Sequence, residues 1–125
     1  MPRVKRVALV VYVVVLTASL LSPNPFAVAG NHQDEVARHF KDWVAPMAHV
    51  ISFVPLGFLA LANCRWPSGL VAALILLVAY ALATEWLQGF IPDRRTDWGD
   101  LTQNLAGIAI GAALWCGVRA ARRGD

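Results

Sequence analysis

Three long apolar runs constrain the fold of this chain more than any other feature. They cover residues 44–63, 69–90 and 101–118, and Glu85 is the only formally charged side chain within them. A helix needs about 20 mainly apolar residues to cross a bilayer, so each run is long enough for one span. A content of 58% apolar and 15% charged residues excludes an ordinary soluble domain. We therefore expect an all-α membrane protein that forms a single domain over residues 1–125.

A fourth apolar segment, residues 7–21, follows a basic start at Arg3, Lys5 and Arg6. It fits two interpretations. A basic start, an apolar middle and the small residues 27–29 are typical of a cleaved secretory signal, whereas the same segment, if retained, is a first transmembrane helix or signal anchor. We favour the retained helix because the rest of the chain is itself expected to lie in the membrane. This gives a bundle of about four transmembrane helices.

The stretch at residues 31–43 is the only extended polar part of the chain. Apolar residues recur there at spacings of three and four, at Val36, Phe40, Trp43 and Met47. We predict a short interfacial helix on the membrane surface after the first span, with a solvated loop as the alternative. His32 and His39 lack the spacing of zinc ligands, so we expect no metal site and no cofactor.

The distribution of basic residues predicts the orientation of the chain in the membrane. The N-terminal segment, the connection near residue 65 and the C-terminal tail hold seven basic residues, namely Arg3, Lys5, Arg6, Arg65, Arg119, Arg122 and Arg123. Basic residues are enriched in cytoplasmic loops, so we expect both termini in the cytoplasm of a multi-pass protein of the bacterial cytoplasmic membrane. These residues form no stripe with interleaved aromatics, and we therefore expect no nucleic-acid partner.

Several polar side chains should then lie at the outer ends of the helices and converge on one outward-facing site. Glu85 is at the end of the third apolar run, and Asp100 is at the start of the fourth. Polar groups kept inside a membrane are costly, so they mark functional sites by default. Arg94 or Arg95 can fold back to pair with Glu85 or Asp100, and the alternative is that such pairs only lock the helical bundle. The candidate site residues are His49, Glu85, Gln88, Arg94, Asp100 and Asn104.

Gly107 and Gly111 continue the face of the fourth helix that Asp100 and Asn104 begin. Small residues four apart allow two membrane helices to approach closely. We expect these glycines to serve helix packing. Replacing Gly107 with a larger residue such as leucine should then force the third and fourth helices apart.

The residues of this region resemble a known family. The pattern consists of Glu85-x-x-Gln88, Pro92-x-Arg94, Asp100-x-x-x-Asn104 and Gly107-x-x-x-Gly111, preceded by His49, Phe53 and the pair Leu56-Gly57. It is similar to the VanZ-like family of small bacterial membrane proteins over about residues 44–115. Members commonly have an Asp-Lys pair just before the histidine. Here Ala45-Pro46-Met47-Ala48 stands in its place.

The resemblance implies a role in the cell envelope, because founding members of the family are associated with resistance to teicoplanin, a lipoglycopeptide. We favour a protein whose outward site binds the headgroups of membrane lipids or of lipid-linked cell-wall precursors. The alternative is a membrane enzyme acting on lipid-linked phosphates or esters, with Glu85 or His49 as general acid or base. Ser52 and Thr84 have no base in helical register, which argues against nucleophilic catalysis. The sequence leaves the oligomeric state open.

Overall fold

The computed structural model describes residues 2–23, 35–64, 67–92 and 96–124, and this part of the chain is helical without strands. There are four helices: α1 (Pro2–Leu20), α2 (Glu35–Ala62), α3 (Pro67–Gln88) and α4 (Trp98–Ala121). The expected all-α architecture is therefore confirmed for the described residues.

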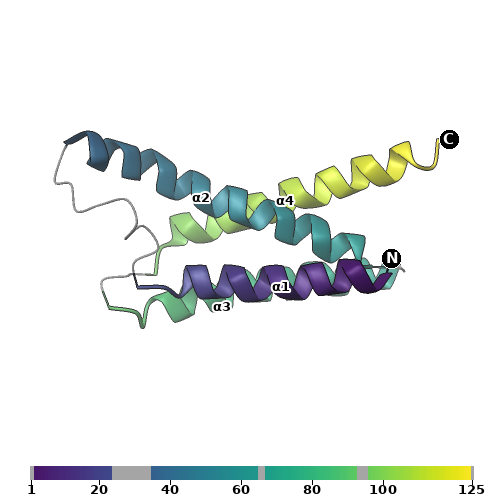
Figure 1. The fold of residues 1–125 in the computed structure, drawn as a ribbon, viewed down its shortest axis with the longest axis horizontal. Coiled ribbons are helices and arrows are strands. Elements are labelled where there is room, and N and C mark those ends of the chain that lie inside the picture. Colours follow the sequence, from purple (N-terminus) through teal and green to yellow (C-terminus); the bar gives the residue numbers. More distant parts are fainter. Residues whose placement is uncertain (1, 24–34, 65–66, 93–95, 125) are drawn as a thin grey trace.

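The helices run alternately in opposite directions, and both termini lie at the same end of the bundle (Figure 1). Helices α1 and α3 lie beside each other, whereas α2 and α4 run in the same direction and cross (Figure 1). The crossing pair forms the most extensive helix–helix interface of the described structure. Elements far apart in sequence thus build the centre of the molecule.

Helix α2 differs from the prediction because it is one continuous helix of 28 residues. The expected separate interfacial helix at residues 31–43 is wrong, since residues 35–43 are the first turns of α2 and residues 31–34 lie outside the described residues. Two prolines, Pro46 and Pro55, stand inside α2. Proline removes one backbone donor, but a membrane-type helix tolerates it where neighbouring helices pack around the site.

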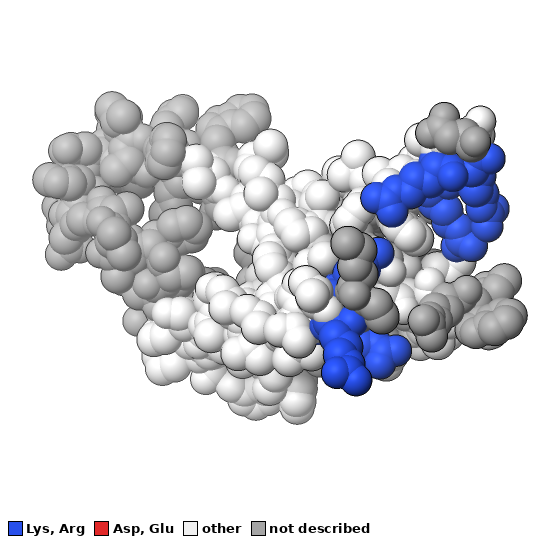
Figure 2. All heavy atoms as spheres, turned by 45° about the vertical axis from the view of Figure 1, so that its right-hand side comes forward, with Lys and Arg blue, Asp and Glu red and all other residues white. Residues whose placement is uncertain are grey.

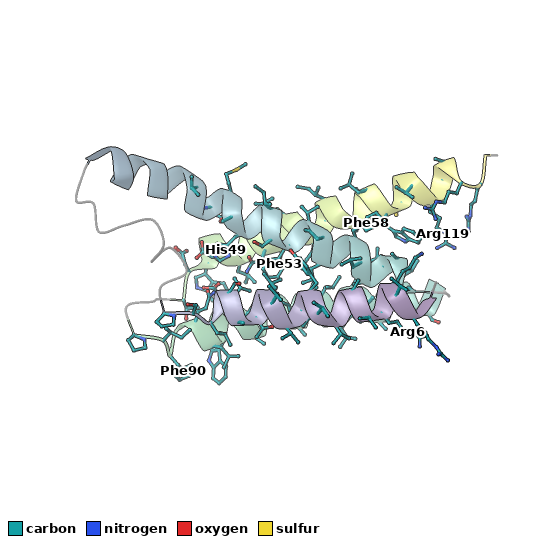
Figure 3. The ribbon with its side chains drawn as sticks, in the orientation of Figure 1. Arg6, His49, Phe53, Phe58, Phe90 and Arg119 are labelled. Carbon is teal, nitrogen blue, oxygen red and sulfur yellow. The ribbon has the colours of Figure 1, made fainter. Side chains whose placement is uncertain are left out.

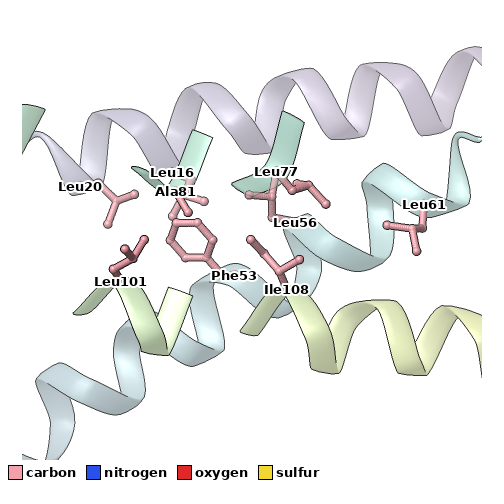
Figure 4. Close-up of a cluster of buried hydrophobic side chains, with 9 residues drawn as sticks. All are labelled: Leu16, Leu20, Phe53, Leu56, Leu61, Leu77, Ala81, Leu101 and Ile108. Atoms are coloured by element: carbon pink, nitrogen blue, oxygen red, sulfur yellow. The ribbon is translucent and has the colours of Figure 1, made fainter. Parts of the chain in front are cut away.

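All four helices contribute to one buried apolar cluster (Figure 4). Phe53 of α2 is completely buried at its centre, and Leu56 is 2% exposed. The other members are Leu16, Leu20, Leu61, Leu77, Ala81, Leu101 and Ile108. Since residues from α1 belong to this cluster, α1 packs as a full member of the bundle.

Two polar contacts also hold α1 in place. Tyr12 Oη donates to the carbonyl of Ser52 in α2 at 2.7 Å. The hydroxyls of Thr17 and Tyr80 lie 2.8 Å apart and link α1 to α3. Hydrogen bonds between helices add to van der Waals packing where the surroundings are apolar.

Glycines allow α2 and α4 to touch along their backbones. A Cβ atom at Gly107 would lie 2.7 Å from the Cβ of Phe53, and one at Gly111 would lie 2.7 Å from the backbone nitrogen of Phe58. Opposite them, a Cβ at Gly57 would lie 2.6 Å from the carbonyl oxygen of Ile108. The glycine face of α4 therefore packs against α2. The expectation that enlarging these glycines would push α4 away from α3 is wrong, because the helix that they contact is α2.

The outside of the bundle is strongly apolar. Large exposed side chains include Val7 and Val14 of α1, Ile75 of α3 and Leu114 of α4. Among the described residues, two helices are long and apolar enough to cross a membrane, Ser68–Gln88 and Trp98–Ala121, and Pro46–Ala62 is a shorter apolar segment. These features support association with a membrane.

Basic side chains gather at the end of the bundle that holds the two termini (Figure 2). They belong to the first turns of α1 and the last turns of α4, where Arg6 and Arg119 mark the two groups (Figure 3). His49 lies toward the opposite end, on the same side of the centre as Phe90 (Figure 3). Among the side chains that the structure describes, the basic ones therefore lie at one end of the bundle.

Candidate functional site

The site begins with His49, whose imidazole bridges α2 and α4. Its Nδ1 lies 2.9 Å from Oδ1 of Asn104, and its Nε2 lies 3.5 Å from Oδ2 of Asp100. Asp100 and Asn104 are four residues apart in α4, so their side chains share one face of that helix. The ring is largely buried, with 13% of its side chain exposed. One histidine thus contacts two polar side chains of a single helical turn.

The two contacts fix the orientation of the imidazole. An amide oxygen only accepts hydrogen bonds, so Nδ1 carries a proton and donates it to Asn104. Nε2 then faces the Asp100 carboxylate, and a proton on Nε2 gives the ring a charge opposite to that of the carboxylate. The imidazole thus ties α2 to two side chains of α4.

The first turn of α4 is held by a residue of another helix. Asp97 is the N-cap, and its Oδ1 accepts from the backbone N–H of Gly99 at 2.7 Å. In a capping box the side chain three residues later accepts from the N-cap N–H. That residue is Asp100, which instead faces His49. Glu85 of α3 takes its place, and its Oε1 accepts from the Asp97 N–H at 2.6 Å.

One carboxylate oxygen of Glu85 has no hydrogen-bond partner in the part of the chain that the structure describes. Its side chain is buried, at 3% exposure, and Oε2 has no hydrogen-bond partner among the described residues. The charges of Asp97, Asp100 and His49 all act on this carboxyl group. Leaving a buried charged acceptor unpaired costs about 1–3 kcal/mol or more, and such a group in a native structure requires an explanation.

The structure brings together four of the six candidate residues. His49, Asp100 and Asn104 are in contact, and Glu85 joins them through the first turn of α4. Gln88 points elsewhere, because its Nε2 donates to the carbonyl of Leu20 in α1 at 2.9 Å. Arg94 lies outside the described residues, so its pairing with Glu85 or Asp100 stays a prediction.

Two further residues at this end were not among the candidates. Asp97 supplies the N–H that holds Glu85, and the spacing Asp97-x-x-Asp100 is a helix-start signal that marks it in the sequence. Gln103 has a buried Oε1 without a hydrogen-bond partner in the described structure. No sequence pattern distinguishes Gln103 from an ordinary polar residue of a helix.

The chemistry of the site follows from its side chains. The carboxylates of Glu85, Asp97 and Asp100 are hydrogen-bond acceptors, and the imidazole of His49 is already engaged by Asn104 and Asp100. Within the parts of the chain that the structure describes, no group of three His, Cys, Asp or Glu side chains is arranged to hold a metal ion. The arrangement is thus suited to bind a group that donates hydrogen bonds.

Comparison with known proteins gives one family. The family model described as VanZ/LLP1 matches residues 7–119, which is most of the chain. No curated protein and no solved structure matches the chain.

Proposed function

Because the chain belongs to the VanZ/LLP1 family, we propose that it is a multi-pass protein of the cell membrane that binds headgroups at the outer surface. The ligands are those of membrane lipids or of lipid-linked cell-wall precursors, and the biological consequence is resistance to lipoglycopeptides of the teicoplanin type. The observation behind this proposal is the buried Oε2 of Glu85, which has no hydrogen-bond partner among the described residues, beside the His49–Asp100 pair. A membrane protein keeps such a group at a cost that a ligand can offset.

The outward direction of the site rests on charge. Among the described side chains, the basic ones occupy the end of the bundle with the two termini, and His49 lies toward the opposite end (Figures 2 and 3). Since basic residues favour the cytoplasmic side, the site faces outward and meets the leaflet where cell-wall precursors are displayed.

This orientation predicts the result of reporter fusions. A reporter fused after Asn31 or after Asp97 in the chain is expected to be active only if it functions outside the cytoplasm. Fusions after Asn63 and after Gly124 are the matched controls, and they should be active only as cytoplasmic reporters. A cytoplasmic signal from the Asp97 fusion contradicts the orientation and the outward site together.

Binding explains the described side chains better than catalysis does. Thr84, next to Glu85, uses its hydroxyl within its own helix, donating to the carbonyls of Tyr80 and Ala81 at 3.0 Å each. A nucleophilic hydroxyl needs instead a base within hydrogen-bonding distance. His49, the natural base of this site, is occupied by Asp100 and Asn104.

The resistance role is tested by antibiotic susceptibility at matched protein levels in the membrane. Glu85→Gln keeps the size of the side chain but removes the charge, and we expect it to lose most of the protection given by the wild type. Arg94→Lys should also weaken protection, because an ammonium cannot reproduce the two-pronged hydrogen bonding of guanidinium. Thr84→Ala is the control, since Thr84 bonds only within α3 in the described structure. If wild type protects and both site variants protect equally well, the cluster has no part in resistance.

A further inference from the structure

Helix α1 contacts the two helical turns that carry His49 and Glu85. We propose that α1 is the positioning element of the site. Tyr12 holds the turn of α2 that contains His49. The backbone carbonyl of Leu20 holds the turn of α3 that contains Glu85. This inference rests on the proposed function, because it concerns how the same site is assembled and which residues outside it the site requires.

The first contact joins α1 to α2. The Oη atom of Tyr12 donates to the carbonyl oxygen of Ser52 at 2.7 Å. Ser52 follows His49 by three residues, so both belong to one turn of α2. The imidazole of His49 in turn lies 2.9 Å from Oδ1 of Asn104 and 3.5 Å from Oδ2 of Asp100. A displacement of this turn by about 1 Å is enough to lose both contacts, because hydrogen bonds require short donor–acceptor distances.

This turn of α2 needs support from outside the helix. Pro55 lies inside α2 and has no backbone N–H, so the carbonyl of Ile51 loses its donor in the helical ladder. Helices in apolar surroundings tolerate such a gap where neighbouring helices support the backbone. Tyr12 gives this support at the next carbonyl, that of Ser52. The hydroxyl of Tyr12 therefore matters more here than it would beside an unbroken helix.

The second contact joins α1 to α3. Nε2 of Gln88 donates to the carbonyl of Leu20 at 2.9 Å, and the side chain of Gln88 is buried. Gln88 follows Glu85 by three residues, so both belong to one turn of α3. Glu85 accepts in turn from the backbone N–H of Asp97 at the start of α4. Helix α1 thus reaches the first turn of α4 through α3.

Both contacts come from a single face of α1. Tyr12, Leu16 and Leu20 recur at every fourth residue, which places them on one side of the helix. Leu16 and Leu20 belong to the buried cluster around Phe53 (Figure 4). Val14, on the opposite side of α1, is exposed. The inner face of α1 is therefore packed into the bundle, where it holds the turns of α2 and α3 in place.

The test compares two Tyr→Phe variants in the purified full-length chain. Tyr12→Phe and Tyr80→Phe each keep the ring and remove one hydroxyl that links α1 to another helix. NMR of protein with isotope-labelled histidine measures how fast the hydrogen on Nδ1 of His49 exchanges with water, and His49→Gln identifies its signal. Backbone hydrogen exchange of residues 49–54, followed by mass spectrometry, is a second readout that needs no histidine signal.

We expect both exchange rates to be about two- to tenfold faster in Tyr12→Phe than in the wild type, which is the effect of losing one hydrogen bond. Tyr80→Phe should exchange at the wild-type rate, because the Tyr80 hydroxyl contacts Thr17 of α1 and not the His49 turn. Wild-type rates in Tyr12→Phe overturn the inference. Equal acceleration in the two variants also overturns it, because this would show a general loosening of the bundle.

Gln88→Met tests the second contact, because it keeps an unbranched side chain and removes the donor to Leu20. The Asp97 amide should then exchange about two- to tenfold faster, and an unchanged rate contradicts the anchoring of α3 by α1. None of these measurements needs a ligand or an antibiotic. If the rates depend on Tyr12 and Gln88 while Glu85→Gln keeps full protection, α1 positions the side chains and only the proposed function fails.

Discussion

Gly111→Leu is expected to prevent the accumulation of folded protein, whereas Gly117→Leu in the same helix leaves it nearly unchanged. At Gly111 even a Cβ would lie 2.7 Å from the backbone nitrogen of Phe58 and 3.1 Å from the Cα of Gly57. Backbone atoms cannot rotate away as side chains do, so α2 and α4 must separate. At Gly117 nothing lies within 4 Å of the same atom.

Overpacked sites typically lower the free energy of unfolding by about 1–3 kcal/mol. For Gly111→Leu we expect a loss at the upper end of this range or beyond it. Separation of the helices would also disturb the buried cluster around Phe53. Thermal unfolding in detergent micelles measures the effect, with membrane abundance as a second readout. Equal stability of the two leucine variants would show that α2 and α4 do not pack through this face.

His49→Leu and Asn104→Leu are expected to destabilise the protein singly and to compensate partly when combined. Asn104 is 1% exposed, and each single change leaves the other side chain without its hydrogen-bond partner. A buried polar group left unpaired costs about 1–3 kcal/mol. The double variant removes both groups, so its loss should be smaller than the sum of the single losses by about 0.6–2 kcal/mol.

The double-mutant cycle separates this contact from the other roles of His49. The cycle compares the wild type, the two single variants and the double variant, and Asp100 is present in all four. Both variants without His49 lose the contact with Asp100 equally, so this loss cancels when the coupling between His49 and Asn104 is calculated. Unfolding midpoints of the four proteins in one detergent give the coupling. Strictly additive losses would show that the two side chains are not in contact in the folded protein.

The sequence predicts the helices of the apolar runs well, because apolar length is a local property, but it predicts one helix too many at residues 31–43. The expected runs at residues 69–90 and 101–118 correspond to α3 and α4, with ends that differ by two or three residues. The start of α4 differs because Asp97, a good N-cap, adds a turn ahead of the apolar run. The continuity of α2 was missed because Pro46 and a change from polar to apolar residues both indicate a boundary.

The pairing of side chains between helices could not be predicted in the same way. Gly107 and Gly111 indicate a close approach, but sequence alone does not say which helix approaches. Glu85 and Gln88 are three residues apart and were expected to share one site, yet Gln88 binds the carbonyl of Leu20. Glu85 and Gln88 are both buried and lie about 60° apart around the axis of α3, so the two side chains meet different neighbours. These choices depend on the arrangement of the whole bundle.

The glycine crossing of α2 and α4 links the two ends of the molecule mechanically. The helices touch most closely near Gly57, Gly107 and Gly111 and diverge on both sides (Figure 1). Asp100 precedes Gly107 by seven residues, which is about 10 Å along a helix. A rotation of about 6° around the crossing therefore moves Asp100 by about 1 Å relative to α2, enough to shorten its contact with His49 to a strong hydrogen bond or to break it. The same rotation swings the far arm of α4, which carries Arg119, in the opposite direction, so a displacement at one end of the helix is accompanied by an opposite displacement at the other.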